Sequence, residues 1–87
     1  MNDITFYGDS WAHYTYWQTQ DKKTLRKINN LIADIKRNGV MQGIGKPEPL
    51  KYRPGYSRRI DDFNRLVYDM DELQNIKIIS CKGHYED

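Results

Sequence analysis

Four side chains in the second half of the sequence have the types that acid–base chemistry needs: a carboxylate, two guanidinium groups and an imidazole. The carboxylate is that of Glu48, which lies in the stretch KPEPLK between Pro47 and Pro49. Flanking prolines restrict the backbone, so they hold this carboxylate in a fixed direction. The imidazole is that of His84, and an imidazole can give or take a proton near neutral pH. Glu48 and His84 are therefore candidates for a base and an acid.

Two arginines are selected by the alternation of side chains along a strand, where residues two apart share one face. In YSRRI the apolar Tyr56 and Ile60 share a face with Arg58. Arg59 therefore points to the other face. In RLVYDM the apolar alternation likewise leaves Arg65 on the opposite face. Arg59 and Arg65 are predicted to lie on the face turned away from the helices, where two guanidinium groups can bind a phosphate.

This set of side chains matches the needs of metal-independent RNA cleavage. That reaction requires a base for the 2'-OH proton, an acid for the 5'-oxygen and cations for the charge that develops on the phosphate. Glu48, His84 and the two arginines could fill these roles. The arginines also have a simpler interpretation as surface ion pairs with carboxylates nearby in the sequence. Those carboxylates are Asp61, Asp62 and Asp69.

Other chemistries are less well supplied with residues. Cys81 and His84 have the spacing C-x-x-H, but a structural zinc site needs four ligands and His13 is the one other obvious donor. A nucleophilic Ser80 or Cys81 beside His84 lacks a third group to orient the base. The stretch GIGKP leads into prolines instead of a helix, which argues against a phosphate-binding loop. We therefore predict no metal and no cofactor, and we expect Cys81 in the core.

The charge of the chain is unevenly distributed, although the formal net charge is only +2. Segments 22–37 and 45–60 are strongly basic, whereas the two ends of the sequence are acidic. Basic segments that also contain Tyr52 and Tyr56 suit a polyanion, because cations neutralise phosphates and rings stack on bases. A solvated helix face is the alternative for 22–37. The candidates for RNA contacts are Lys22, Lys23, Arg26, Lys27, Lys46, Lys51 and Arg58.

Apolar periodicity and turn residues predict a single α+β domain over residues 1–87. A strand is expected at 4–7, and helices are expected at about 9–20 and from 22 to a stop at Gly39. After a loop rich in glycine and proline, short strands are expected at 50–52, 56–60, 65–70 and 76–82. The order βααββββ predicts a helical hairpin packed on one face of a twisted antiparallel sheet.

The composition indicates a soluble, cytoplasmic protein. Hydrophobic residues make up 38% of the sequence, and no apolar run approaches the roughly 18 to 20 residues that a membrane span needs. No signal peptide precedes the first expected strand. Cys81 is the single cysteine, so an internal disulfide cannot form, which suits a reducing compartment.

Several stretches, read in order, resemble one protein family. They are YWQTQDKKTLRKINNLIADIKRNG, GIGKPEPLK, YSRRID, NRLVY and HY. The combination is similar to the YoeB family of bacterial toxins, also called Txe, within the RelE superfamily, and the resemblance runs from about Trp11 to Tyr85. It implies a RelE-like fold and a ribosome-dependent endoribonuclease that cleaves mRNA in the ribosomal A site. It also implies neutralisation by a YefM-type antitoxin, and a second copy of the chain is a further candidate partner.

The resemblance implies roles for individual residues. The family's general base falls on Glu48, its general acid on His84, and its phosphate-stabilising arginines on Arg59 and Arg65. The terminal tyrosine of the family falls on Tyr85, where it would orient the scissile nucleotide. The lysine of PLK falls on Lys51. The implied products are a 2',3'-cyclic phosphate or 3'-phosphate and a 5'-OH.

The sequence also departs from the family pattern. The loop between PLK and SRR is short and has Tyr56 where tryptophan is common, Phe63 replaces a polar residue, and Glu86 and Asp87 follow the usual terminal HY. Two functions without cleavage therefore stay open. One is a protein of this fold that acts by binding, as the ParE-type proteins act on DNA gyrase. The other is a degenerate member that binds RNA or a partner.

Overall fold

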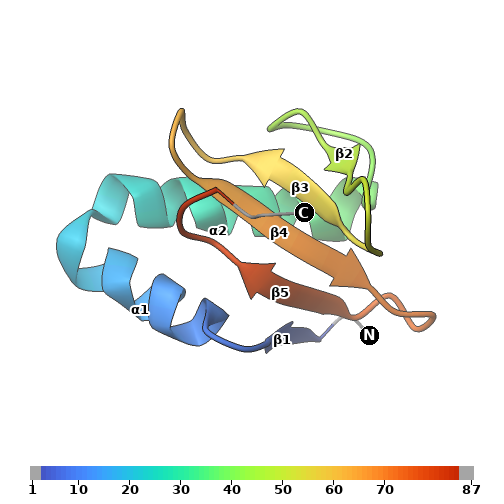
Figure 1. Ribbon diagram of the computed structural model, residues 1–87, viewed down its shortest axis with the longest axis horizontal. Coiled ribbons are helices and arrows are strands. Elements are labelled where there is room, and N and C mark those ends of the chain that lie inside the picture. The colour runs from blue at the N-terminus through green and yellow to red at the C-terminus, as the bar shows by residue number, and fades with distance from the viewer. Residues whose placement is uncertain (1–2, 85–87) are drawn as a thin grey trace.

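The order of helices and strands follows the βααββββ prediction (Figure 1). The computed structural model describes residues 3–84. Its elements are β1 (Ile4–Phe6), α1 (Ser10–Gln20), α2 (Lys22–Asn38), β2 (Glu48–Pro49), β3 (Tyr56–Arg59), β4 (Arg65–Met70) and β5 (Ile76–Ser80). In Figure 1, α2 crosses behind the sheet and α1 runs beside β1 and β5, so the opposite face of the sheet is left uncovered by helices.

The sheet is mixed, which corrects the prediction of an antiparallel sheet. Its strand order is β1-β5-β4-β3-β2, and β1 pairs in parallel with β5, whereas the other pairs are antiparallel. A parallel pair needs a long crossover connection. The two helices that follow β1 begin such a connection, and the chain returns through the other strands before β5 joins β1.

Local capping explains why α2 begins and ends where it does. Asp21 precedes the helix, and its carboxylate accepts the backbone N–H groups of Lys23 and Thr24. Gly39 follows the helix with a φ of 88°, a value that favours glycine. Between these caps, one side of the helix is apolar and buried against the inner face of the sheet. Its buried residues are Thr24, Ile28, Leu31, Ile32 and Ile35.

The second strand corrects another prediction. It is β2, at Glu48–Pro49, and not a strand at 50–52. The Leu50 N–H donates to the Gly55 carbonyl at 2.9 Å, so residues 50–55 close a short hairpin loop between β2 and β3. Glu48 pairs with Ser57 across this hairpin. The carboxylate therefore stands on the edge strand itself and not in the loop before it.

Arg58 was predicted to contact RNA, and the structure shows that this was wrong. The side chain is fully buried on the inner face of the sheet, as the alternation of YSRRI indicates. Its Nε donates to the Tyr68 hydroxyl, and its Nη1 donates to Asp34 Oδ2 at 2.5 Å. The remaining donors bind backbone carbonyls of the loop after α2, those of Gly39, Gln42 and Ile44. All five N–H donors of the guanidinium are thus used inside the protein.

No helix in the described part of the chain is long and apolar enough to span a membrane.

We expect the substitution Arg58→Met to destabilise the fold strongly. It keeps a long side chain but leaves Tyr68, Asp34 and three loop carbonyls without their donor. The free energy of unfolding should fall by about 3 to 5 kcal/mol, as in other buried ion pairs that lose one partner. Urea denaturation measures this change. Arg37→Met, at the exposed end of α2, is the control and should shift stability by no more than about 0.5 kcal/mol; equal stability of the two variants would contradict the expectation.

Candidate active site

Glu48 is placed by both β2 and the loop that precedes it. The Arg59 N–H donates to the Gly45 carbonyl at 2.7 Å, which joins this loop to the end of β3. Lys46 then takes a φ of 52°, so the chain turns sharply before it enters β2. The Glu48 side chain is exposed. It is therefore an accessible carboxylate on a backbone that is fixed on both sides.

Arg59 and Arg65 lie directly opposite each other on β3 and β4. Arg59 is exposed and forms an ion pair with Asp62 in the β3–β4 turn, one of the surface pairs that the sequence left open. Arg65 is half-buried, and its Nη1 donates to the backbone carbonyls of Asp61 at 2.8 Å and Asn64 at 3.2 Å. The prediction that both arginines share the face turned away from the helices is confirmed.

His84 reaches this face because the chain after β5 crosses the start of β4. The Arg65 N–H donates to the Gly83 carbonyl at 3.1 Å, and the Gly83 N–H donates to Asn64 Oδ1 at 2.7 Å. The imidazole of the next residue, His84, is exposed. Tyr85, the remaining predicted site residue, lies outside the described residues.

One open cleft of about 420 Å³ brings three of the predicted catalytic residues together: Glu48, Arg65 and His84. A smaller hollow of about 230 Å³ is lined by Lys46, Glu48, Ser57, Arg59 and Arg65. The two hollows share Glu48, Ser57 and Arg65. A phosphate between them would therefore meet both arginines, with the carboxylate and the imidazole at the same cleft.

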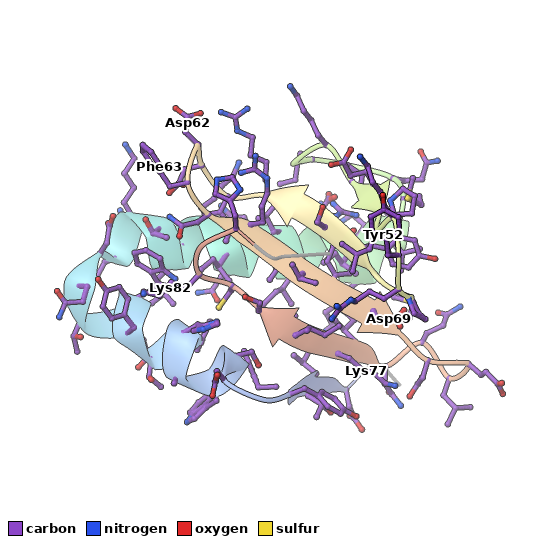
Figure 2. All side chains as sticks on the ribbon, in the orientation of Figure 1. Tyr52, Asp62, Phe63, Asp69, Lys77 and Lys82 are labelled. Atoms are coloured by element: carbon purple, nitrogen blue, oxygen red, sulfur yellow. The ribbon has the colours of Figure 1, made fainter. Side chains whose placement is uncertain are left out.

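The cleft also contains residues that were not selected from the sequence. Ser57 and Val67 pair across β3 and β4, next to Glu48 in the same row. Their alternation with Arg59 and Arg65 is the signal that would have found them. The other lining residues come from the β2–β3 hairpin. Figure 2 shows Tyr52 of this hairpin beside the start of β3, whereas Asp62 lies beyond the end of that strand. These hairpin residues are Pro49, Leu50, Tyr52 and Lys51, of which Lys51 was predicted as an RNA contact.

Apart from the buried Arg58, the predicted RNA-contact lysines and arginines fall in two places. Lys51 lines the cleft and Lys46 lines the smaller hollow. The others lie in the first turns of α2, where Lys22, Lys23 and Arg26 are exposed and Lys27 is half-buried. Lys23 and Lys27 also line a depression with Ile60 and Asp61 of the β3–β4 turn. The basic end of α2 therefore approaches the turn that carries Asp62.

Metal binding and a reactive thiol are two other chemistries that the side chains could supply. Within residues 3–84 there is no group of three or more His, Cys, Asp or Glu side chains that could hold a metal ion. Cys81 is buried in the core as predicted, and burial raises the pKa of its thiol to about 12. The thiol therefore stays protonated, which disfavours it as a nucleophile.

Helix α1 holds the segment from which His84 extends. Trp17 Nε1 donates to the Cys81 carbonyl at 2.9 Å, and the Cys81 N–H donates to His13 Nδ1 at 3.2 Å. An imidazole nitrogen accepts a hydrogen bond only when it is unprotonated. Burial, and secondarily the charge of Lys82, lowers the pKa of His13, which keeps the ring in this neutral form.

Comparison with known proteins shows which family this chain belongs to. The model of the YoeB-like toxins of bacterial type II toxin–antitoxin systems matches residues 6–85. The chain belongs to this family. The toxin YoeB of Streptomyces coelicolor is 48% identical over 84 residues, covering 94% of this chain and 98% of that protein. The toxin YoeB of Escherichia coli K12 is 44% identical over 79 residues, covering 88% and 92%.

Solved structures of YoeB-like toxins share the whole fold. In a heterotetrameric YoeB–YefM toxin–antitoxin complex from Staphylococcus aureus, the matching chain has a TM-score of 0.89 and 49% identity, covering 98% of this chain and 99% of that one. A YoeB dimer from the same species has a TM-score of 0.89 and 50% identity, covering 97% and 98%. A mutant of Escherichia coli YafQ has a TM-score of 0.77 at 15% identity over 97% and 94%, which shows a shared fold alone.

We expect acidification to destabilise the protein through His13. Its folded-state pKa lies below 6.5, so the unfolded chain binds this proton more readily. The stabilisation is complete above about pH 6.5 and is lost as the pH falls through the folded-state pKa. The urea midpoint should therefore be lower at pH 5 than at pH 7.5. His13→Asn, which offers an oxygen near the position of Nδ1, should show a smaller pH difference, and an unchanged difference would contradict this role.

Proposed function

We propose that this protein is a ribosome-dependent endoribonuclease that cleaves mRNA in the ribosomal A site and so blocks translation. The observation that carries the proposal is the single cleft that contains Glu48, Arg65 and His84, with Arg59 across the strand pair. A base, an acid and two cations on one open surface are what cleavage through the 2'-OH requires. Membership of the YoeB-like toxins supports the same reaction.

In the proposed reaction, Glu48 removes the proton from the 2'-OH of the nucleotide before the cut. The 2'-oxygen attacks the adjacent phosphorus, and Arg59 and Arg65 stabilise the negative charge that builds up on the phosphate oxygens. His84 donates a proton to the 5'-oxygen as the bond from phosphorus to that oxygen breaks. The products are a 2',3'-cyclic phosphate and a 5'-OH end. In this scheme Tyr85 orients the nucleotide, and Lys51 contributes positive charge at the cleft.

The ion pair between Arg59 and Asp62 is compatible with phosphate binding. The two side chains are 43% and 72% exposed, and exposed pairs of this kind contribute only about 0 to 1 kcal/mol. An RNA phosphate can therefore replace Asp62 as the partner of Arg59, and the attraction grows as charge builds up on the phosphate oxygens in the transition state. The basic turns of α2 would meanwhile contact the ribosomal RNA through Lys22, Lys23, Arg26 and Lys27.

A YefM-type antitoxin is the proposed inhibitor. The Staphylococcus aureus relative is found in a YoeB–YefM complex, and the open face of this chain presents arginines that suit an acidic partner. We propose that an acidic antitoxin segment folds onto this face, covers Arg59 and Arg65, and displaces the segment with His84. A homodimer is a further proposed state, since another relative is a dimer. Action on ribosomes would place the protein in the cytoplasm.

We expect Glu48→Gln, Arg65→Ala and His84→Gln each to abolish mRNA cleavage and relieve growth arrest in a bacterium. Loss of an acid or base costs about 100- to 10,000-fold in rate. The measurement is 5'-end mapping of an mRNA translated in vitro with each variant.

Glu72→Gln is the matched control, because Glu72 is an exposed carboxylate in the β4–β5 turn, away from the cleft. The control should cleave like the wild type, and all variants should still bind the antitoxin. Undiminished cleavage by the Glu48 and His84 variants would reject the proposal. A translation block with intact mRNA would instead favour a protein that acts by binding.

A further inference from the structure

The β3–β4 turn connects the proposed acid to the rest of the site through one side chain. Asn64 stands at the end of this turn, and its Oδ1 accepts the Gly83 N–H at 2.7 Å. Gly83 immediately precedes His84. The backbone position of the imidazole is therefore linked to the direction of the Asn64 amide.

The Asn64 amide is itself held by a carboxylate on the same turn. Its Nδ2 donates to Oδ1 of Asp61 at 3.0 Å and to Oδ2 at 3.1 Å. An ionised carboxylate only accepts hydrogen bonds, so the nitrogen end of the amide must face Asp61. The oxygen end must then face Gly83. Asp61 also accepts the backbone N–H groups of Phe63 and Asn64 at 2.8 Å, which fixes the carboxylate in turn.

Arg65 depends on the same turn in a different way. Its Nη1 donates to the backbone carbonyls of Asp61 and Asn64. A substitution of the Asn64 side chain leaves both carbonyls in the chain. The Gly83 carbonyl keeps its hydrogen bond from the Arg65 backbone N–H in such a variant, whereas the bond from the Gly83 N–H requires the Asn64 side chain. The Gly83 amide that precedes His84 can therefore be released by mutation without removing the partners of the Arg65 guanidinium.

We infer that Asn64 is a positioning residue for the acid of the reaction: it orients Gly83 and thereby sets His84 over the cleft. The inference rests on the proposed function, in which His84 protonates the 5'-oxygen. Asn64 touches no reacting atom. Its effect is on the distance and angle at which the imidazole meets the leaving oxygen, and a misplacement of about 1 Å can cost about 100-fold in rate.

The test is single-turnover cleavage of mRNA on programmed ribosomes by Asn64→Ala, His84→Gln and the double variant. We expect Asn64→Ala to lower the maximal rate by about 10- to 100-fold with unchanged affinity for the ribosome. In the His84→Gln background the same substitution should cost little more, because the group it positions is gone. Gln18→Ala, which removes an exposed amide from α1, is the control and should cleave at the wild-type rate.

A second variant and a second measurement keep the test independent of folding defects. Exchanging the two side chains, Asp61→Asn together with Asn64→Asp, keeps an oxygen that can accept from Gly83 and keeps an amide beside a carboxylate, so its loss of rate should be smaller than that of Asn64→Ala. Hydrogen exchange at the Gly83 amide should be faster in Asn64→Ala than in the wild type, whether or not the protein is active.

The outcomes separate the two proposals. Full cleavage by Asn64→Ala, or an equal further loss in the His84→Gln background, would overturn the role of Asn64 while leaving the proposed function intact. A wild type that does not cleave, or a His84→Gln variant that cleaves as fast as the wild type, would overturn the proposed function and this inference with it.

Discussion

The buried guanidinium of Arg58 ties β3 to the loop that leads into the site. A charge in the core is tolerated only when it is paired and fully hydrogen-bonded, and here Asp34, Tyr68 and three loop carbonyls supply the partners. The loop after α2 must therefore follow one path. Gly43 is required on this path, because a Cβ there would lie 1.8 Å from the Asp34 carboxylate, at a φ of 114°. The loop then leads directly to Glu48 at the edge of the sheet.

Two adjacent residues of β3 have different roles, one in the core and one at the surface. Arg58 points inward and stabilises the loop, whereas Arg59 points outward to the surface where phosphate would bind. The β3–β4 turn has a similar double role, since Asp61 and Asn64 hold both Arg65 and the segment that carries His84. The site thus consists of short segments. Contacts on the inner face of the sheet and within the β3–β4 turn fix their positions.

Local rules predicted much of this arrangement. The glycine signal at Gly39 predicted the end of α2, and strand alternation placed Arg59 and Arg65 on the open face. The parallel pairing of β1 with β5 could not be predicted in this way, because it depends on contacts between distant segments. The charge of Arg58 favours a contact with RNA, but its position in the strand alternation places it on the inner face of the sheet. The hydrogen bond between Asn64 and Gly83 joins residues 19 apart, beyond the reach of any local pattern.

The claim that Arg58 fixes the loop leading to Glu48 can be tested by hydrogen exchange in the conservative variant Arg58→Lys. The Ile44 N–H donates to Asp34, and the Arg59 N–H donates to Gly45, so these two amides report on the loop. We expect both amides to lose more protection in the variant than the amides of α2 around Leu31. Unchanged protection of Ile44 and Arg59 would contradict the claim.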